Sequence, residues 1–150
     1  MLPTDAADED MLALENQFCF ALYSTSLAMT KTYKGLLDKL GLTYPQYLAM
    51  LVLWKKDGVL VKDIGEQLML DSGTLTPLLK RLETLGFLTR IRDEHDERQV
   101  RISLTREGRN LKRKAIAIPS QVLCATGKSH STLRDLRELL LQVRHDLLKS

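Results

Sequence analysis

The spacing of apolar residues predicts a mainly helical chain. Leucines recur three and four residues apart over most of the sequence and Gly and Pro are few, which is typical of amphipathic helices. The pattern predicts a first helix at 10–34, a second that Thr43 caps and that ends near residue 57, and a short third at 61–70. A fourth ends at Gly86, a residue favoured just past a helix.

The sequence leaves two positions for the start of this fourth helix, because Pro77 fits without distortion only in the first turn of a helix. One alternative places the cap at Asp71 or Ser72, with a slightly disturbed first turn. The other places the cap at Thr76, with Pro77 as the first helical residue. In either case one apolar face is expected, made of Leu75, Leu78, Leu79, Leu82 and Leu85.

After Phe87 the apolar period changes to two. This predicts strands at 87–92 and 99–104, joined by the polar loop 93–98 as a β-hairpin. A short helix, a tight turn, a second helix and a two-stranded ribbon in this order form a winged helix-turn-helix. The second helix of such a unit fits the major groove of DNA.

Two further helices are expected after the hairpin. Thr105 caps the first, which Pro119 bends or breaks, and the second covers about 131–148 with a leucine-rich stripe suited to packing against another helix. The fold class is therefore mainly α with a small β-hairpin wing. The chain, 1–150, is read as one unit with a winged lobe at about 43–105 and helical regions at about 8–40 and 106–150.

The polar face of the fourth helix carries the candidate DNA contacts. Lys80 and Arg81 suit phosphates or guanine, and Thr74 and Thr76 suit phosphate or a thymine methyl. A Lys-Arg pair on an amphipathic helix is equally often an ordinary solvated face, so each residue alone is weak. The whole arrangement is more specific than any residue in it.

The hairpin carries four arginines: Arg90, Arg92, Arg98 and Arg101. An arginine at a wing tip can enter a narrow minor groove, and Arg98 is the best candidate. Asp96, two residues earlier, is expected to brace it by ion pairing. The acidic residues at 93–97 oppose phosphate, so only part of the wing can approach DNA.

The charge permits an anionic partner without requiring one. Residues 1–18 carry five acidic and no basic side chains, so the remaining 132 residues carry a net charge of +8. No apolar run spans a membrane and the acidic start is no leader peptide, so no membrane partner and a cytoplasmic location are expected. Scattered histidines and the absence of a phosphate loop predict no metal and no cofactor.

Cys19 is the candidate reactive group. Tyr23 lies on the same helical face one turn away, whereas Tyr33 lies about 21 Å along the axis of a continuous helix. Tyr33 would therefore reach only the Cys19 of an antiparallel partner. The alternative is a purely structural role, in which Cys19 is a buried cysteine that packs as a small apolar residue between two phenylalanines.

Two segments carry a family resemblance. Residues 70–82 read LDSGTLTPLLKRL and residues 96–105 read DERQVRISLT. With nearly the whole chain, these segments resemble the MarR family of winged-helix repressors, and more narrowly the organic hydroperoxide resistance regulators. The resemblance implies a homodimer on a pseudopalindromic double-stranded operator, with 72–85, including Ser72, as recognition helix and Asp96 and Arg98 as wing contacts.

The resemblance also implies a thiol switch. Tyr23 and the partner's Tyr33 would donate hydrogen bonds to the Cys19 sulfur, and such bonds favour a thiolate. The thiolate would attack the peroxide O–O bond to give a sulfenic acid, and Cys124, from the other subunit in the two-cysteine branch, would close a disulfide. An apolar pocket of Phe18, Phe20 and Leu22 would favour organic hydroperoxides.

The function expected is thus a peroxide-sensing repressor and not an enzyme. Two alternatives remain open. One is a repressor of the same family that a small aromatic ligand releases from DNA. The other is a thiol peroxidase that turns over, although a peroxidase has no use for a base-reading helix.

Overall fold

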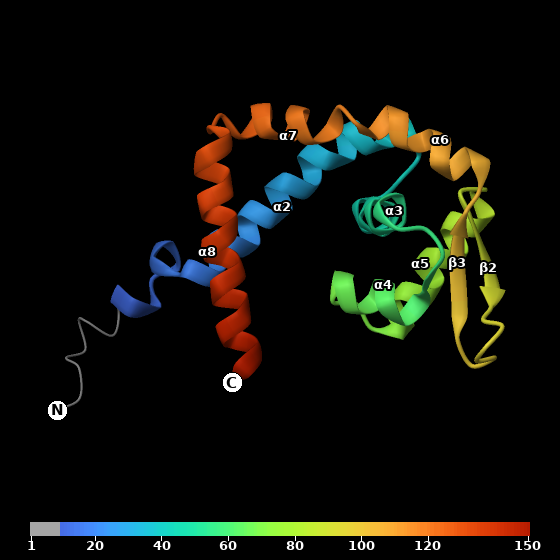
Figure 1. Ribbon diagram of the computed structural model, residues 1–150. Coiled ribbons are helices and arrows are strands. Elements are labelled where there is room, and N and C mark those ends of the chain that lie inside the picture. Colours follow the sequence, from blue (N-terminus) through green and yellow to red (C-terminus); the bar gives the residue numbers. More distant parts are fainter. Residues whose placement is uncertain (1–9) are drawn as a thin grey trace.

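The computed structural model describes residues 10–150, most of which form helices around a small sheet (Figure 1). The elements are η1 (Leu14–Asn16), α2 (Phe18–Leu37), η2 (Asp38–Leu40), α3 (Tyr44–Lys55), β1 (Val59–Leu60), α4 (Val61–Leu68), α5 (Ser72–Thr84), β2 (Leu88–Arg92), β3 (Val100–Leu104), α6 (Arg106–Ala115), α7 (Ile118–Thr126) and α8 (His130–Lys149). This is the mainly α, winged helix-turn-helix class that the sequence predicts.

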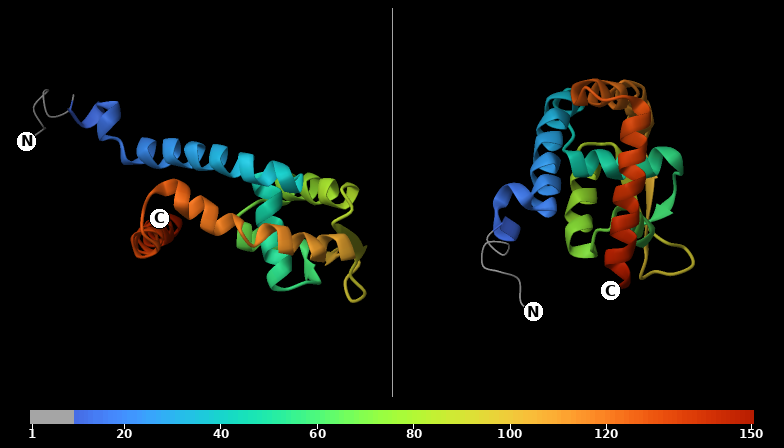
Figure 2. Two further views of the ribbon diagram at one scale, coloured as in Figure 1. Left: turned by 90° about the horizontal axis from the view of Figure 1, so that it is seen from above. Right: turned by 90° about the vertical axis from the view of Figure 1, so that its left-hand side faces the viewer.

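About half of the helices and all three strands form a lobe at one end of the molecule. Helices α3, α4 and α5 and the three strands form a lobe, and α2 and α7 extend from it side by side (Figures 1 and 2). At the far end of α7 the chain turns and α8 runs across it. Helices α2 and α7 therefore leave the lobe together, although eighty residues separate them in sequence.

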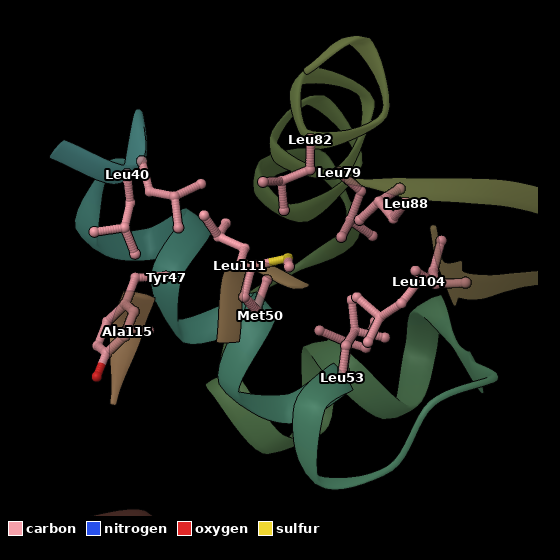
Figure 3. Packing of buried hydrophobic residues seen from close by; sticks show 14 of the residues in the cluster. Leu40, Tyr47, Met50, Leu53, Leu79, Leu82, Leu88, Leu104, Leu111 and Ala115 are labelled. Atoms are coloured by element: carbon pink, nitrogen blue, oxygen red, sulfur yellow. The ribbon is translucent and has the colours of Figure 1, made fainter. Parts of the chain in front are cut away.

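The core lies inside the lobe and beneath α6 (Figure 3). Leucines from α3, α5 and the sheet interdigitate there, with Leu53, Leu79 and Leu88 at most 1% exposed. Helix α6 joins this core through Leu111, and the Trp54 indole N–H donates to the Gly108 carbonyl oxygen at 2.9 Å. A Cβ at Gly108 would lie 2.0 Å from the Phe87 carbonyl oxygen, so only glycine permits this approach of α6 to the sheet.

Helix α5 begins at the earlier of the two predicted positions. The Asp71 carboxylate accepts from the Thr74 backbone N–H at 2.8 Å, which satisfies one donor of the first turn. Pro77 is then the sixth helical residue, and the carbonyl four residues before it belongs to Gly73, which has no side chain to crowd the distortion. The alternative cap at Thr76 is wrong.

The sheet has one strand more than the predicted hairpin. Strand β3 lies between β1 and β2, all antiparallel, with Val59 opposite Ile102 and Leu88 opposite Leu104. The two residues of β1 are too few to show an alternating pattern, which is why the sequence did not indicate them. Their pairing covers the edge of β3 and fixes the base of the wing to the start of α4.

The first predicted helix is wrong at its beginning. Instead of one helix over 10–34, a short 3-10 turn precedes α2, and Gln17 between them is extended at φ −84° and ψ 113°. The Gln17 amide donates to the carbonyl oxygens of Met11 at 2.7 Å and Ala13 at 3.0 Å, which stabilises this break. Cys19 consequently lies in the first turn of α2 rather than in the middle of a helix.

The later helices follow the prediction closely. A break at residues 116–117 separates α6 from α7, with Pro119 in the first turn of α7, and Ser129 caps α8 one residue earlier than expected. No residue of the 20-residue α8 is buried. None of the helices formed by residues 10–150 is apolar over enough of its length to cross a bilayer.

Candidate nucleic-acid interface and thiol residues

One face of α5 packs into the lobe and the other faces solvent. Leu75, Leu79 and Leu82 are at most 1% exposed. Ser72, Thr74, Lys80 and Arg81 are exposed and Thr76 is half-buried. The predicted contact residues therefore lie on the free face, as their spacing required.

The wing lies beside the start of α5. A cleft of about 640 Å³ opens between α4, α5 and the sheet, and Ser72, Thr76 and Arg98 are among its lining residues. The structure thus brings together residues that lie more than twenty positions apart in sequence. Lys80 and Arg81, further along α5, do not line this cleft.

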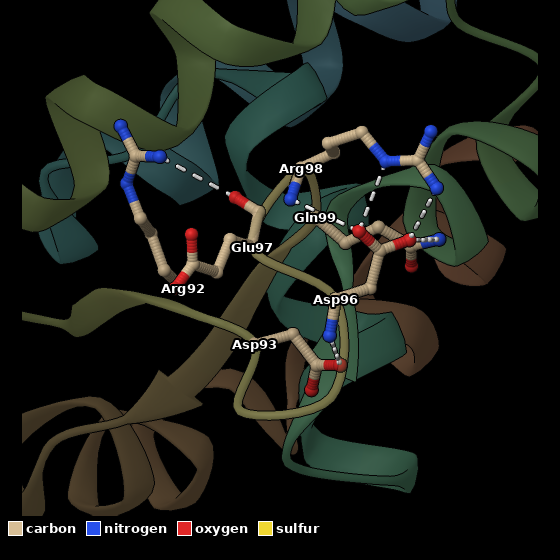
Figure 4. Close-up of polar contacts among 6 residues, drawn as sticks. All are labelled: Arg92, Asp93, Asp96, Glu97, Arg98 and Gln99. Atoms are coloured by element: carbon tan, nitrogen blue, oxygen red, sulfur yellow. Dashed lines mark hydrogen bonds and ion pairs between the residues drawn. The ribbon is translucent and has the colours of Figure 1, made fainter.

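Arg98 and Asp96 form the expected ion pair at the wing tip (Figure 4). The Asp96 carboxylate accepts from Arg98 Nε at 3.1 Å and from the Arg98 backbone N–H at 3.1 Å. These bonds hold the pKa of Asp96 below its usual range. The Arg98 side chain is 91% exposed, so the pair orients the guanidinium while leaving it open to solvent.

Two other arginines of the hairpin are engaged inside the protein. Arg90 pairs with Glu83 of α5, whose carboxylate also accepts from the Arg90 backbone N–H at 3.0 Å. Arg101 pairs with Asp93, at 2.8 Å between Nη2 and Oδ1. Of the four arginines that the sequence offered to DNA, the structure leaves Arg92 and Arg98 on the exposed surface.

The thiol residues are spread along the helices outside the lobe. Cys19 in α2 and Cys124 in α7 are both exposed free thiols. Within residues 10–150 the Tyr23 hydroxyl makes no hydrogen bond, and Phe18, Phe20 and Tyr23 are each more than 40% exposed. The apolar pocket predicted around Cys19 is therefore not formed by the described part of a single chain.

Tyr33 lies at the other end of α2, as the rise of a continuous helix requires. Its ring packs on Tyr44 at 4.7 Å and on Tyr47 at 5.8 Å between centroids. Burial, with smaller contributions from these two neighbours, raises the pKa of Tyr33 to about 12. Its phenol therefore stays protonated at neutral pH and remains a hydrogen-bond donor.

Tyr44 is a candidate functional residue that the sequence did not indicate. It lines a cavity of about 270 Å³ together with Tyr33, Leu22 of α2 and Leu140 of α8. Burial raises the pKa of Tyr44 as well. In the sequence Tyr44 stands directly after the helix cap Thr43, and this position indicated only the start of a helix.

The described residues hold no group of three metal-ligating side chains.

These features define a winged-helix protein with an appended helical region that carries two thiols. A family model described as transcriptional regulator SarA/Rot matches residues 31–115. The organic hydroperoxide resistance transcriptional regulator of Bacillus subtilis is 56% identical over 131 residues, which cover 87% of this chain and 89% of that protein. The chain belongs to the MarR family of winged-helix regulators, in the group of organic hydroperoxide resistance regulators.

Solved structures agree with this placement. Reduced AbfR bound to DNA, a protein of Staphylococcus epidermidis, is 33% identical with a TM-score of 0.76, over 93% of this chain and 98% of that one. AbfR in its disulfide form is 32% identical and covers 97% of both chains, but with a TM-score of 0.61. Overoxidised AbfR bound to DNA has a TM-score of 0.74, so the fold of this chain is more similar to the two DNA-bound forms than to the disulfide form.

Proposed function

We propose that this chain is a homodimeric DNA-binding repressor that organic hydroperoxides inactivate through Cys19. The observation that carries the proposal is the placement of both cysteines. Each is an exposed thiol on a helix outside the winged lobe, in a region where large apolar side chains such as Phe18 and Leu136 are exposed as well. A second copy that covers these helices would couple thiol chemistry to the positions of two winged lobes.

The winged lobe, about 43–105, is assigned to DNA. Ser72, Thr74 and Thr76 at the exposed start of α5 and Lys80 and Arg81 further along it suit the major groove and its phosphates. Arg98, braced by Asp96, suits the adjacent minor groove. Two lobes related by a twofold axis would read a pseudopalindromic duplex.

The helices at about 8–40 and 106–150 are assigned to the dimer; of these, residues 8 and 9 lie outside the described part. Leu136 and Leu139 of α8 are 51% and 59% exposed, and Phe18 of α2 is 57% exposed. Large apolar side chains gathered on helices in this way mark an interface. Tyr33 lies about 21 Å along α2 from the Cys19 of its own chain, but an antiparallel partner would bring its Tyr33, and the Tyr44 packed against it, to that Cys19.

The chemistry begins at the start of α2. Cys19 lies in the first turn, where the positive end of the helix dipole favours an anion. Protonated phenols of Tyr23 and of the partner's Tyr33 and Tyr44 add hydrogen bonds to a thiolate. The thiolate sulfur attacks the hydroperoxide, the O–O bond breaks, and the products are a Cys19 sulfenic acid and an alcohol.

The second step joins two thiols. The Cys124 sulfur attacks the Cys19 sulfur of the other subunit, a disulfide forms, and the sulfenic oxygen leaves as water. A disulfide needs Cα atoms within about 7 Å, so exposed thiols on separate helices must move to meet. A half-site spacing of about 34 Å on DNA tolerates little rotation of the lobes, and the lower TM-score to disulfide-form AbfR supports such a movement.

Release from DNA tests this function. The probe is a duplex that the reduced protein selects from random-sequence DNA. Cumene hydroperoxide is expected to release the parent, to leave Cys19→Ser bound, and to act incompletely on Cys124→Ser. A Cys19→Ser variant that peroxide releases as readily as the parent would remove Cys19 from the mechanism.

One observation favours a second candidate, a repressor that a small aromatic ligand releases. The cavity of about 270 Å³ between α2, α3 and α8 is lined by Tyr33, Tyr44 and Leu140 and is large enough for one aromatic ring. In that case salicylate alone would release both the parent and Cys19→Ser, without peroxide.

A further inference from the structure

Asp93 stands at the end of β2 and connects three parts of the wing. Its Oδ1 accepts from Arg101 Nε at 3.1 Å and from Arg101 Nη2 at 2.8 Å, and its Oδ2 accepts from the Asp96 backbone N–H at 3.2 Å. The Asp93 side chain is only 9% exposed. Both carboxylate oxygens are therefore used, one for strand β3 and one for the wing tip.

Arg101 continues the connection to the other edge of the sheet. Its Nη1 donates to the carbonyl oxygen of Gly58, in the turn before β1. That turn is itself fixed, because Gly58 has a φ of +71° and the Asp57 carboxylate accepts from the backbone N–H of Gly58 and of Leu104, each at 2.8 Å. One guanidinium thus links a rigid turn to Asp93.

We infer that Asp93 and Arg101 are positioning residues for DNA binding, which set the place of Arg98 without touching DNA. The chain of contacts runs from Gly58 through Arg101 to Asp93. It continues from Asp93 to the Asp96 backbone and from the Asp96 carboxylate to Arg98, as Figure 4 shows. This inference rests on the proposed role of Arg98 at DNA. It gives a reason for an acidic residue in a wing that approaches phosphates.

Because Asp93 is negatively charged, the direction in which Asp93→Asn changes DNA affinity tests the inference. If Asp93 acted only through its charge, Asp93→Asn would remove repulsion from phosphates and tighten binding. An amide, however, offers one acceptor oxygen where the carboxylate uses two, so the link to Arg101 or to Asp96 is lost. Positioning therefore predicts weaker binding, by about tenfold, because the Arg98 contact is misplaced.

Arg101→Lys provides the complementary change. It keeps the positive charge, but a single ammonium nitrogen cannot replace the planar fork that reaches both Asp93 and Gly58. Weaker binding is again expected, by a similar factor. Glu94→Gln is the matched control, because the exposed Glu94 of the same loop makes no side-chain hydrogen bond or ion pair with residues 10–150. It should bind as well as the parent, or more tightly.

The experiment measures the affinity of the reduced protein for its selected duplex at several salt concentrations, in the parent and in an Arg98→Ala background. Asp93→Asn and Arg101→Lys should weaken binding in the parent and have no further effect once Arg98 is gone. Tighter binding of Asp93→Asn, or an equal loss in both backgrounds, would overturn the positioning role. A parent that selects no duplex would instead refute the proposed function.

Discussion

Leu79 and Leu139 lie on helices of similar amphipathic pattern, yet Leu79 of α5 is fully buried and Leu139 of α8 is 59% exposed. The leucines on the inner face of α5 in the winged lobe, Leu75, Leu79 and Leu82, find their packing partners within one chain. Most leucines of α8, and Phe18 and Phe20 in the first turn of α2, are exposed. The core of the lobe is thus formed by one copy, whereas we propose that a second copy covers the exposed apolar residues of α2 and α8.

The largest effect should come from the lobe. Leu79→Ala removes a fully buried side chain and leaves a cavity, which costs about 2–5 kcal/mol of unfolding free energy. Because Leu79 packs within one chain, the loss should persist at every protein concentration. Urea unfolding monitored by circular dichroism at two concentrations measures it.

Leu136→Asp should disrupt the proposed dimer interface on α8. The exposed Leu136 belongs to the stripe of α8, and a charge in an apolar interface is strongly unfavourable. We expect a monomer by analytical ultracentrifugation, with a far-ultraviolet spectrum that still reports a folded lobe. Glu138→Gln on the same helix should leave the dimer intact. A dimer that survives Leu136→Asp unchanged would place the interface elsewhere.

Arg98→Ala sharpens the comparison at the DNA surface. Loss of a wing contact should cost about 1–3 kcal/mol of binding free energy without changing the oligomeric state. If Arg98 neutralises one phosphate, the slope of affinity against salt should also fall by about one. Arg113→Ala, an exposed arginine of α6, is the control and should change neither quantity.

The sequence predicted those parts of the fold that local patterns encode. Thr43, Thr105 and the break near Pro119 marked helix ends correctly, and the period of two located the hairpin. Two features of the fold were not predicted from the sequence. Strand β1 is too short to have a pattern, and the break at Gln17 depends on its side chain bonding to preceding carbonyls, which no propensity encodes.

The candidate site was predictable to a smaller extent. The free face of α5 and the Asp96–Arg98 pair followed from spacing alone. The engagement of Arg90 by Glu83 and of Arg101 by Asp93 did not, because these partners meet only when the sheet and α5 pack together. Tyr44 was missed for the same reason, since it joins Tyr33 only through the packing of α3 against α2.

A smaller effect is expected at alkaline pH. The pKa of Tyr33 is raised to about 12 from an ordinary value near 10, so the folded state holds this proton more tightly than the unfolded state. Its contribution to stability is complete below pH 10 and is lost as the pH rises from 10 toward 12. In Tyr33→Phe the decline of unfolding free energy between pH 9 and 11 should be shallower. Tyr23→Phe, which alters an exposed ring, should follow the parent.

The two thiols are proposed to act across two copies of the chain. A non-reducing gel after one equivalent of cumene hydroperoxide per Cys19 tests it most directly. The parent should run as a covalent dimer that dithiothreitol reverses, and Cys19→Ser and Cys124→Ser should each run as monomers. A parent that remains monomeric while peptide mapping finds Cys19 oxidised would contradict the intersubunit disulfide.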